Sequence, residues 1–521
     1  MYIGDRKLLI FWGFYAEVIN LDLTNEVLRD RLYTQYAYIG GCVMVPESIK
    51  KHRPTCTEVR ERNGAYYVYR YSSVWDPVKK RAKKKTGECI GKITEQDGFI
   101  PSPRKQTSEV TSVIVKEYGC YHMFRTMNGG MYDILRKHFP STYREVFVIS
   151  IIRLLNRATN RTIKNYYNAS YLSEEIKGLH LSENTITSFM RNLGEQRDQM
   201  IEFMREFVPQ GETLLFDGTC FFNSSKNATY PRKGYNPRRS QAKQINVLYV
   251  FDRNNRAPIY YRLLPGNIVD KAAVEATFRE ADIKNCIAIG DKGCYSKHIT
   301  GFMDGEGISY IYPLNINTKY VSGEFRSQLG YEKYDDAFVY HGRTIWFKKQ
   351  TVGANGKHIY IYQDSGVKVE KENRYMEKYK ANAEGYTLEG FHEKQKDYGM
   401  SFLYSNIDTG AEEVYLAYKT RWELEEMFDY LKNSLNLGRV SQQSNEAMEA
   451  WAFLNHICMM MFYKLSKAMI DASLSDTYTP EDMMGLAKNI SKVCINDKWY
   501  LSEISKADRD LFMRIAVEYE Q

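Results

Sequence analysis

The chain has 521 residues, of which 43% are hydrophobic and 26% are charged. This balance excludes a disordered or fibrous protein, and the length predicts roughly two to four domains. The net charge of +8 is small for a chain of this size, so local clusters of charge carry more information than the total.

The N-terminal segment contains one apolar run, Leu8 to Ala16, which is too short to span a bilayer. We therefore expect no membrane association. Met44 stands just before the first convincing strands, and our hypothesis is that residues 1–43 are a translated leader. The nine cysteines are scattered and form no C-x-x-C pair, so a disulfide framework and a zinc site are not predicted and a reducing cytoplasm fits best.

Residues 44–130 are predicted to form a β-rich basic region. Alternating residues around YYVYRY and the turn pair Asn63-Gly64 predict a small antiparallel sheet. Cations then crowd a hairpin tip, namely Lys79, Lys80, Arg81, Lys83, Lys84 and Lys85. They form either a solvated loop or a wing that contacts phosphates. We expect DNA contacts from Lys79, Lys80, Lys83 and Lys84.

Residues 131–210 change to a helical pattern, which includes REVFVISIIRLLNRA and SENTITSFMRNLG. Ser182 is the expected N-cap of the second of these helices. Short helices of this kind suit a helix-turn-helix DNA reader, and they suit helical packing without nucleic acid equally well. We interpret the segment as a helical DNA-binding region.

Residues 211–316 alternate between strands and helices. Three strands are expected in succession at 212–219, 244–252 and 257–266, followed by a helix at 271–281, a strand ending at Asp291, a short helix and a strand at 308–314. A hairpin meander that continues into crossovers predicts a mixed sheet with helices on its faces. This α/β order is the ribonuclease-H-like arrangement.

The last third of the chain is expected to interrupt this core and then complete it. Residues 317–407 predict a β-rich insertion before the last core helix. Residues 408–471 predict the last part of the core with its packing helices, in which Met459 to Phe462 belong to the hydrophobic interior. Residues 472–521 are predicted to be helical.

Two aspartates occupy similar settings in the core. Asp217 and Asp291 are each expected to close an apolar strand, and carboxylates at strand ends project into the crevice where α/β sheets place their chemistry. A lone aspartate there is usually a turn former. Two carboxylates on neighbouring strands repel each other unless a cation lies between them, and Mg²⁺ is the divalent ion that carboxylates commonly hold. A third carboxylate is then expected.

The segment YKTRWELEEMFDYLKN, from Tyr418 to Asn433, predicts a single helix. At about 100° per residue, four polar residues fall within about 60° of arc, beside an apolar face. They are Tyr418, Arg421, Glu425 and Lys432. Glu425 lies at the edge of the buried side, where it could act as a metal ligand. The flanking cations, Arg421 and Lys432, could bind phosphate.

Other acidic residues share this helix. Glu423 and Glu426 are expected to point away from the apolar face, whereas Asp429 lies close to the polar stripe and geometry alone does not exclude it. An amphipathic helix stabilised by spaced ion pairs is the alternative explanation of the same pattern.

The four stripe residues, separated by two, three and six positions, resemble the YREK signature of DDE insertion-sequence transposases. They follow FDGT and GDKGCYS, which resemble the two aspartate segments of that family. The resemblance covers about residues 212–470. It implies a ribonuclease-H-like core in which Asp217, Asp291 and Glu425 bind metal, while Tyr418, Arg421 and Lys432 contact phosphates of the transposon end.

The resemblance also implies a function. Such a protein binds terminal inverted repeats, hydrolyses phosphodiesters at the element ends and joins the 3′ hydroxyls to target DNA, using two Mg²⁺ ions or Mn²⁺ as a substitute. Its partners are double-stranded DNA and a second copy in a synaptic homodimer, and its expected location is the bacterial cytoplasm, associated with the nucleoid. The alternatives are an inactive, domesticated DNA-binding protein and a nuclease of the same fold without strand transfer.

A basic loop follows the first aspartate, from Asn223 to Lys243. It is either a solvated loop or, beside the site, a grip on the DNA backbone. The cations expected to bind DNA are Lys226, Arg232, Lys233, Arg238 and Arg239.

Overall fold

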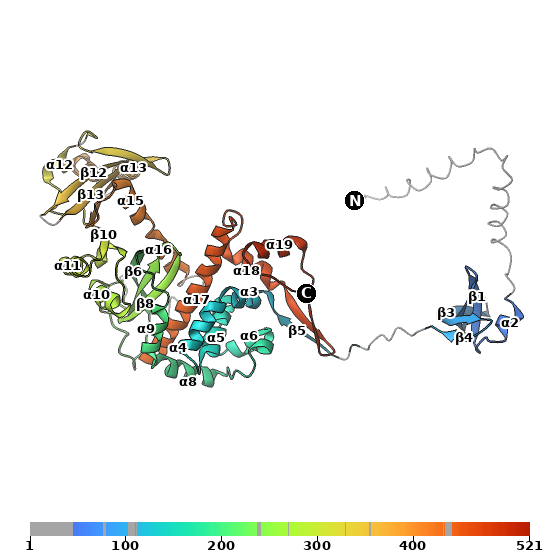
Figure 1. The fold of residues 1–521 in the computed structure, drawn as a ribbon. Coiled ribbons are helices and arrows are strands. Elements are labelled where there is room, and N and C mark those ends of the chain that lie inside the picture. Colours follow the sequence, from blue (N-terminus) through green and yellow to red (C-terminus); the bar gives the residue numbers. More distant parts are fainter. Residues whose placement is uncertain are drawn as a thin grey trace, which may run out of the picture. The chain divides into compact units, whose positions relative to one another are not determined.

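The computed structural model describes residues 45–76, 80–102, 110, 112–236, 241–268, 270–328, 330–353, 356–430, 432 and 440–520. The chain divides into two compact units, residues 1–109 and 110–521, which are treated separately below (Figure 1). The expected leader at 1–43, together with Lys79, Arg238 and Arg239, lies outside the described residues. Among the helices described, none has the length and apolar character needed to cross a membrane.

The first unit is a four-stranded antiparallel sheet in the order β1-β2-β3-β4. Its elements are α2 (Glu47–Lys50), β1 (Thr57–Arg62), β2 (Ala65–Asp76), β3 (Arg81–Thr94) and β4 (Gly98–Pro101). Asn63 and Gly64 both have positive φ, 52° and 76°, as the predicted tight hairpin turn requires. Ile49, Val68 and Ile93 form a small buried core of this unit. The predicted antiparallel sheet is confirmed.

The second unit begins with β5 (Val113–Glu117) and a layer of helices. These are α3 (Gly119–Met127), α4 (Gly129–His138), α5 (Tyr143–Asn156), α6 (Ile163–Ala169), α7 (Leu172–Glu175), α8 (Glu183–Gly194) and α9 (Arg197–Arg205). Helix α5 is apolar on all sides and is buried from Val146 to Leu155, because it packs among other helices. The Ser182 hydroxyl accepts a hydrogen bond from the Thr185 amide (3.2 Å), which confirms the expected N-cap of α8.

The central strands have the predicted ribonuclease-H-like order. The strands β6 (Thr213–Phe222), β7 (Gln244–Asp252) and β8 (Ala257–Pro265) form an antiparallel meander. Helix α10 (Asp270–Glu280) leads to β9 (Ile287–Gly290), and α11 (Lys297–Gly305) leads to β10 (Ser309–Pro313). Strand β9 pairs parallel with both β6 and β10, which gives the order β10-β9-β6-β7-β8.

The insertion extends this sheet. It contains α12 (Gly323–Ser327), β11 (Asp336–Tyr340), β12 (Arg343–Val352), β13 (Lys357–Asp364), α13 (Ser365–Lys380), α14 (Leu388–Gln395) and β14 (Met400–Ser405). Strand β14 pairs antiparallel with β10, so the nine strands run β11-β12-β13-β14-β10-β9-β6-β7-β8 in one sheet. The predicted β-rich segment is thus continuous with the core.

The C-terminal segment differs from the helical prediction. It contains α18 (Pro480–Lys488) and α19 (Lys506–Arg514), but β15 (Ser491–Ile495) and β16 (Lys498–Leu501) lie between them. Strand β15 pairs with β5 from the start of the same unit. The prediction is wrong here because the partner strand lies far away in the sequence, and strand formation depends on that pairing.

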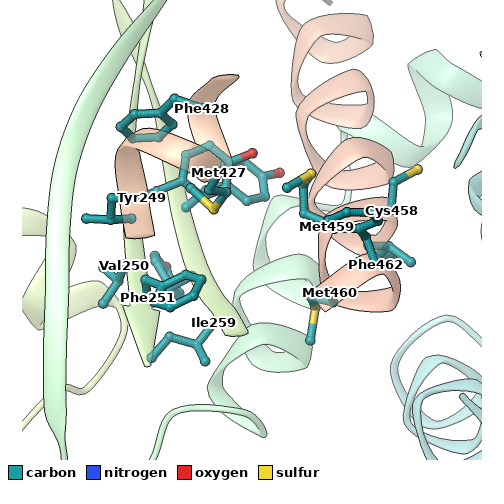
Figure 2. Close-up of a cluster of buried hydrophobic side chains, with 14 of the residues drawn as sticks. Tyr249, Val250, Phe251, Ile259, Met427, Phe428, Cys458, Met459, Met460 and Phe462 are labelled. Carbon is teal, nitrogen blue, oxygen red and sulfur yellow. The ribbon is translucent and has the colours of Figure 1, made fainter. Parts of the chain in front are cut away.

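The long helix α17 (Asn445–Asp471) forms the centre of the hydrophobic core of the second unit. Met459, Met460, Met461 and Phe462 are at most 7% exposed, as predicted. In Figure 2, Met459, Met460 and Phe462 share a cluster with Met427 and Phe428 and with residues of β7 and β8. Phe428 packs against Tyr249 of β7 with 6.0 Å between ring centroids. This packing holds the segment around residue 425 against the sheet.

The buried His456 of α17 predicts acid sensitivity of the fold. Its ring is fully buried beside Tyr249 and Tyr261, and neither ring nitrogen has a hydrogen-bond partner within the described part of the chain. Burial, reinforced by the charge of Arg197, lowers the pKa of His456 to about 3 from an ordinary value of 6.5. The unfolded chain therefore binds a proton at a higher pH than the folded one. The resulting stability is present above pH 6.5 and is lost by about 1.4 kcal/mol per pH unit between pH 6.5 and 3.

The variant His456→Leu should lose this part of the pH dependence, because leucine carries no titratable group. Urea unfolding at pH 7.5, 6 and 5 measures it, with the exposed His392→Leu as the control. Equal slopes of stability against pH in wild type and His456→Leu would contradict the assignment.

Candidate active site

The two aspartates lie side by side on neighbouring strands. Phe216 of β6 is in register with Gly290 of β9, so Asp217 and Asp291 are the next residues on two parallel strands. Adjacent strands are about 5 Å apart, which brings the two carboxylates to the same edge. Asp291 follows the end of β9 as expected. Asp217 does not close its strand, because β6 continues to Phe222 through its pairing with β7.

The segment from Tyr418 to Asn433 is not one helix. Helix α15 (Ala411–Lys419) ends before Arg421, and α16 (Trp422–Asp429) begins after it. The Thr420 hydroxyl donates a hydrogen bond to the Ala417 carbonyl (2.7 Å), and the Arg421 amide bonds to Tyr418 (3.1 Å), three residues earlier instead of four. The tightened turn sets Arg421 at the junction of the two helices.

Arg421 joins all three carboxylates of the expected triad. Its Nη1 donates to Asp217 Oδ2 at 2.8 Å, and its Nη2 donates to Glu425 Oε1 at 2.6 Å. The same Nη2 lies 3.9 Å from Asp291 Oδ1. The structure thus gathers Asp217, Asp291 and Glu425, which come from three separate parts of the chain, around one guanidinium.

Arg421 and the three carboxylates differ in how far their side chains are exposed to solvent. The Arg421 side chain is 16% exposed, compared with 15% for Asp217, 40% for Asp291 and 61% for Glu425. Burial alone would lower the pKa of Arg421, but the neighbouring acidic groups outweigh it and raise the pKa. Burial also raises the pKa of Tyr418, which lies against Arg421. One buried cation therefore offsets part of the negative charge of three carboxylates that differ in exposure.

The other acidic residues of α16 are placed differently from one another. Glu423 was expected to point away from the apolar face, and this is wrong: its side chain is 9% exposed and its Oε1 lies 3.4 Å from Nη1 of Arg256. Burial raises the pKa of Glu423. The reason is the β7–β8 turn, which carries Arg256 and packs over this side of α16. Glu426 and Asp429 are exposed. Of the acidic residues of α16, Glu425 alone is recorded in contact with Arg421.

The three carboxylates are the type of ligand that binds divalent metal ions. Mg²⁺ and Mn²⁺ prefer carboxylate oxygens, and three carboxylates converge here on a single cationic point. The cation at that point is the Arg421 guanidinium. Within the described ranges, no group of three or more His, Cys, Asp or Glu side chains stands ready to hold a metal. Asp217, Asp291 and Glu425 could hold metal ions only if the Arg421 guanidinium moves away from them.

Lys432 and the basic loop lie near the far end of β6. Lys432 is half-buried, and its Nζ lies 5.7 Å from the centroid of the Phe221 ring. Lys226, Arg232 and Lys233 are exposed. The binding of phosphate by these cations stays a prediction.

Sequence reasoning missed the residues that hold the basic loop in place. Asn223 and Ser225 are buried, and they donate to the carbonyls of Val440 and Gln443 at 3.0 and 3.1 Å. The Asn445 side chain at the start of α17 accepts from the amides of Thr229 and Tyr230. The short Asn-Ser run after a strand was the only local signal of such an anchor. The first part of the loop is thus fixed to the segment that follows α16.

A hollow opens beside Asp291. It is lined by Asp291, Lys292, Tyr295 and Tyr320, together with Pro313 at the end of β10 and Leu314, Asn315, Asn317 and Thr318 after it. One carboxylate of the triad therefore faces an open space with a lysine and two aromatic side chains on its walls.

Gly290 sets the position of Asp291, which gives a second prediction. A Cβ at Gly290 would stand 2.5 Å from the Phe216 ring and 2.7 Å from the Tyr312 ring, and both rings are buried. Gly290→Ala should push β9 away from β6 and cost about 1–3 kcal/mol in unfolding free energy. Gly301→Ala on α11, where a Cβ meets nothing, is the matched control. Thermal unfolding measures both, and equal stability of the two variants would contradict the close packing.

The family comparison agrees with this geometry. The transposase DDE domain family matches residues 209–461, just under half of the chain, and this range contains the triad and all nine strands of the large sheet. This segment is similar to the transposase DDE domain family, and its sheet has the ribonuclease-H-like strand order.

Two solved structures show weaker likeness. A cryo-electron microscopy structure of a piggyBac transposase synaptic complex with hairpin DNA shares 11% identity, over 71% of this chain and 76% of that chain, with a TM-score of 0.38. A Mos1 transposase paired-end complex with the left transposon end shares 13% identity, over 31% of this chain and 56% of that chain, with a TM-score of 0.14. These scores support no conclusion about this chain. No curated protein matches the sequence.

Proposed function

We propose that this protein is an insertion-sequence transposase that cuts DNA at the ends of its element and joins the 3′ hydroxyls to target DNA. The observation that carries the proposal is the meeting of Asp217, Asp291 and Glu425 at Arg421 inside the DDE domain. Convergence of these residues from three separate segments is what a catalytic site requires, and an amphipathic surface helix does not require it.

The residues have distinct proposed roles. Asp217, Asp291 and Glu425 hold two divalent ions, Mg²⁺ or Mn²⁺. A divalent ion held there would supply activation of an attacking oxygen and charge stabilisation at a leaving oxygen. Asp217 is the most buried of the three and orients the site, since its Oδ1 also accepts a hydrogen bond from the Gly218 amide at 2.8 Å.

The cations supply DNA contacts. Arg421 can make a bidentate fork with a phosphate once it leaves the carboxylates, and Tyr418 adds a hydroxyl donor. Lys432, Lys226, Arg232 and Lys233 contact the backbone beside the triad, while Lys80, Lys83 and Lys84 do so from the first unit. Double-stranded DNA, as terminal inverted repeats and as target, is the proposed partner. Pairing of two ends calls for a homodimer, and the proposed location is the bacterial cytoplasm.

A strand-transfer assay tests the proposal. Duplexes carrying the ends of the native element are incubated with the protein and Mg²⁺ or Mn²⁺, and 3′ end cleavage and joining to a plasmid are scored separately. Both products are expected. Cleavage without joining would indicate a nuclease of the same fold, and binding without either product would indicate an inactive DNA-binding protein.

A further inference from the structure

The hairpin of the first unit has a distal half that extends beyond the other strands of its sheet. Strand β1 pairs with β2 only as far as Arg70, and β4 pairs with β3 only from Gly91 onward. Beyond these points, strand pairing of Tyr71–Asp76 with Arg81–Thr86 is the ladder that the structure describes. Contacts with the preceding segment and β1 lie at its base, where the Tyr71 amide donates to the Cys56 carbonyl and Thr86 bonds to Glu58. We call this two-stranded part, residues 71–76 and 80–86, the distal ribbon. Two-stranded ribbons are marginally stable by themselves, so a ribbon of this kind is typically stabilised by a partner.

Both faces of the distal ribbon are exposed, and they differ in chemistry. Side chains alternate along a strand, so Tyr71, Trp75 and Lys84 share one face. Val74, Lys83 and Lys85 share the opposite face, and Arg81 lies at its outer end. All residues from 71 to 75 and from 80 to 85 are exposed. One face is therefore aromatic, and the other is strongly cationic.

The exposure of Trp75 is costly without a partner. The side chain is 63% exposed and Val74 is 51% exposed, although each could bury a large apolar surface. Lys84 is already engaged, since its Nζ lies 2.5 Å from Glu58 Oε2 and 4.3 Å from the Tyr71 ring centroid. Among the described residues, no ion pair is recorded for Lys80, Arg81, Lys83 or Lys85. All four side chains are exposed, so an external anion can reach them.

We propose that the distal ribbon enters a groove of duplex DNA, with its cationic face on the phosphates and Trp75 against the groove wall. The major groove, about 12 Å wide, admits a two-stranded ribbon, and six residue pairs give a reach of about 20 Å. The ribbon carries five cations and one carboxylate, Asp76, and this net positive charge favours binding to a polyanion. This inference rests on the proposed function in taking DNA as the substrate, and it adds which element grips the duplex outside the DDE domain.

Binding of a labelled random-sequence duplex of about 30 base pairs tests the ribbon, since phosphate contacts do not depend on sequence. The full chain carries Asp217→Asn so that DNA is not cut, and anisotropy is recorded across a range of salt concentrations. Triple substitution of Arg81, Lys83 and Lys85 by alanine should lower affinity roughly 100-fold and reduce the salt slope by about 2–3. Trp75→Ala should lower affinity roughly 10-fold while leaving the salt slope unchanged.

The matched control removes three other exposed cations of the same unit, Lys51, Arg53 and Lys92, the last of which lies on the covered part of β3. Less than a threefold change is expected. Equal losses in the two triple variants would overturn the ribbon as the site, and so would wild-type affinity in Trp75→Ala. Strand transfer that proceeds while the ribbon variants keep full duplex affinity overturns this inference alone. Ribbon-dependent binding without strand transfer overturns the proposed function alone.

Discussion

Replacing Asp217 by asparagine should abolish both end cleavage and strand transfer, by at least about 1000-fold. The change keeps the size of the side chain and removes the charge of the most buried carboxylate of the triad, which is 15% exposed. Loss of one ligand charge from a site that stabilises phosphoryl transfer costs several kcal/mol in the transition state, which corresponds to this factor. Quantitation of joined product under single-turnover conditions measures it.

The matched control is Glu426→Gln, which removes a carboxylate from the exposed side of α16 without touching Arg421. Activity within about threefold of wild type is expected, since exposed charges away from the site interact weakly. Activity of Asp217→Asn equal to that of this control would remove Asp217 from the site. Glu425→Gln and Asp429→Asn extend the comparison to the choice between these two carboxylates. Only the first should be inactive, because Glu425 contacts Arg421 at 2.6 Å.

Arg421→Gln should have two opposite effects, which is the second large prediction. Strand transfer should fall by roughly 100-fold or more, because a positioned arginine on a transferring phosphate is worth this much or more. The affinity of the DNA-free protein for Mn²⁺ should rise by roughly 10-fold. The guanidinium is the cation that Asp217, Asp291 and Glu425 share. Once it is removed, a metal ion no longer has to compete with it for the three carboxylates.

Electron paramagnetic resonance of free Mn²⁺ measures this affinity without reference to activity. The control is Arg256→Gln, which breaks the 3.4 Å ion pair with Glu423 and leaves the triad intact. Its Mn²⁺ affinity should match that of the wild type. Unchanged or weaker Mn²⁺ binding by Arg421→Gln would show that the guanidinium does not compete with metal for the carboxylates.

Several features of the site could be predicted from local sequence patterns. The strand order β6-β7-β8 followed by β9 and β10 follows from apolar runs, turn residues and one amphipathic helix, which are all short-range signals. Asp217 and Asp291 could be singled out because each follows a buried run on strands that the topology makes neighbours. The spacing of Tyr418, Arg421 and Glu425 places them on one side of helical backbone, and the tightened turn at Thr420 does not change this.

Other features depend on partners far away in the sequence. Glu423 is buried because Arg256, in the β7–β8 turn, lies against it, and a helical wheel contains no information about that turn. Strand β15 exists through its pairing with β5, and the insertion became part of the core sheet through the pairing of β14 with β10. Such pairings are decided by packing between distant segments, because β-propensity is weak and depends on context.

The sequence by itself thus determined the order of the core elements, the three carboxylates and the class of domain, since these depend on residue type and short-range spacing. Only the tertiary structure decided that Arg421 stands at the centre of the triad, within 4 Å of all three carboxylates. Whether a cation faces phosphate or carboxylate depends on which segments fold around it. In this protein, two strands and a helix junction bring the acidic groups to Arg421, and their combined charge outweighs the cost of its burial.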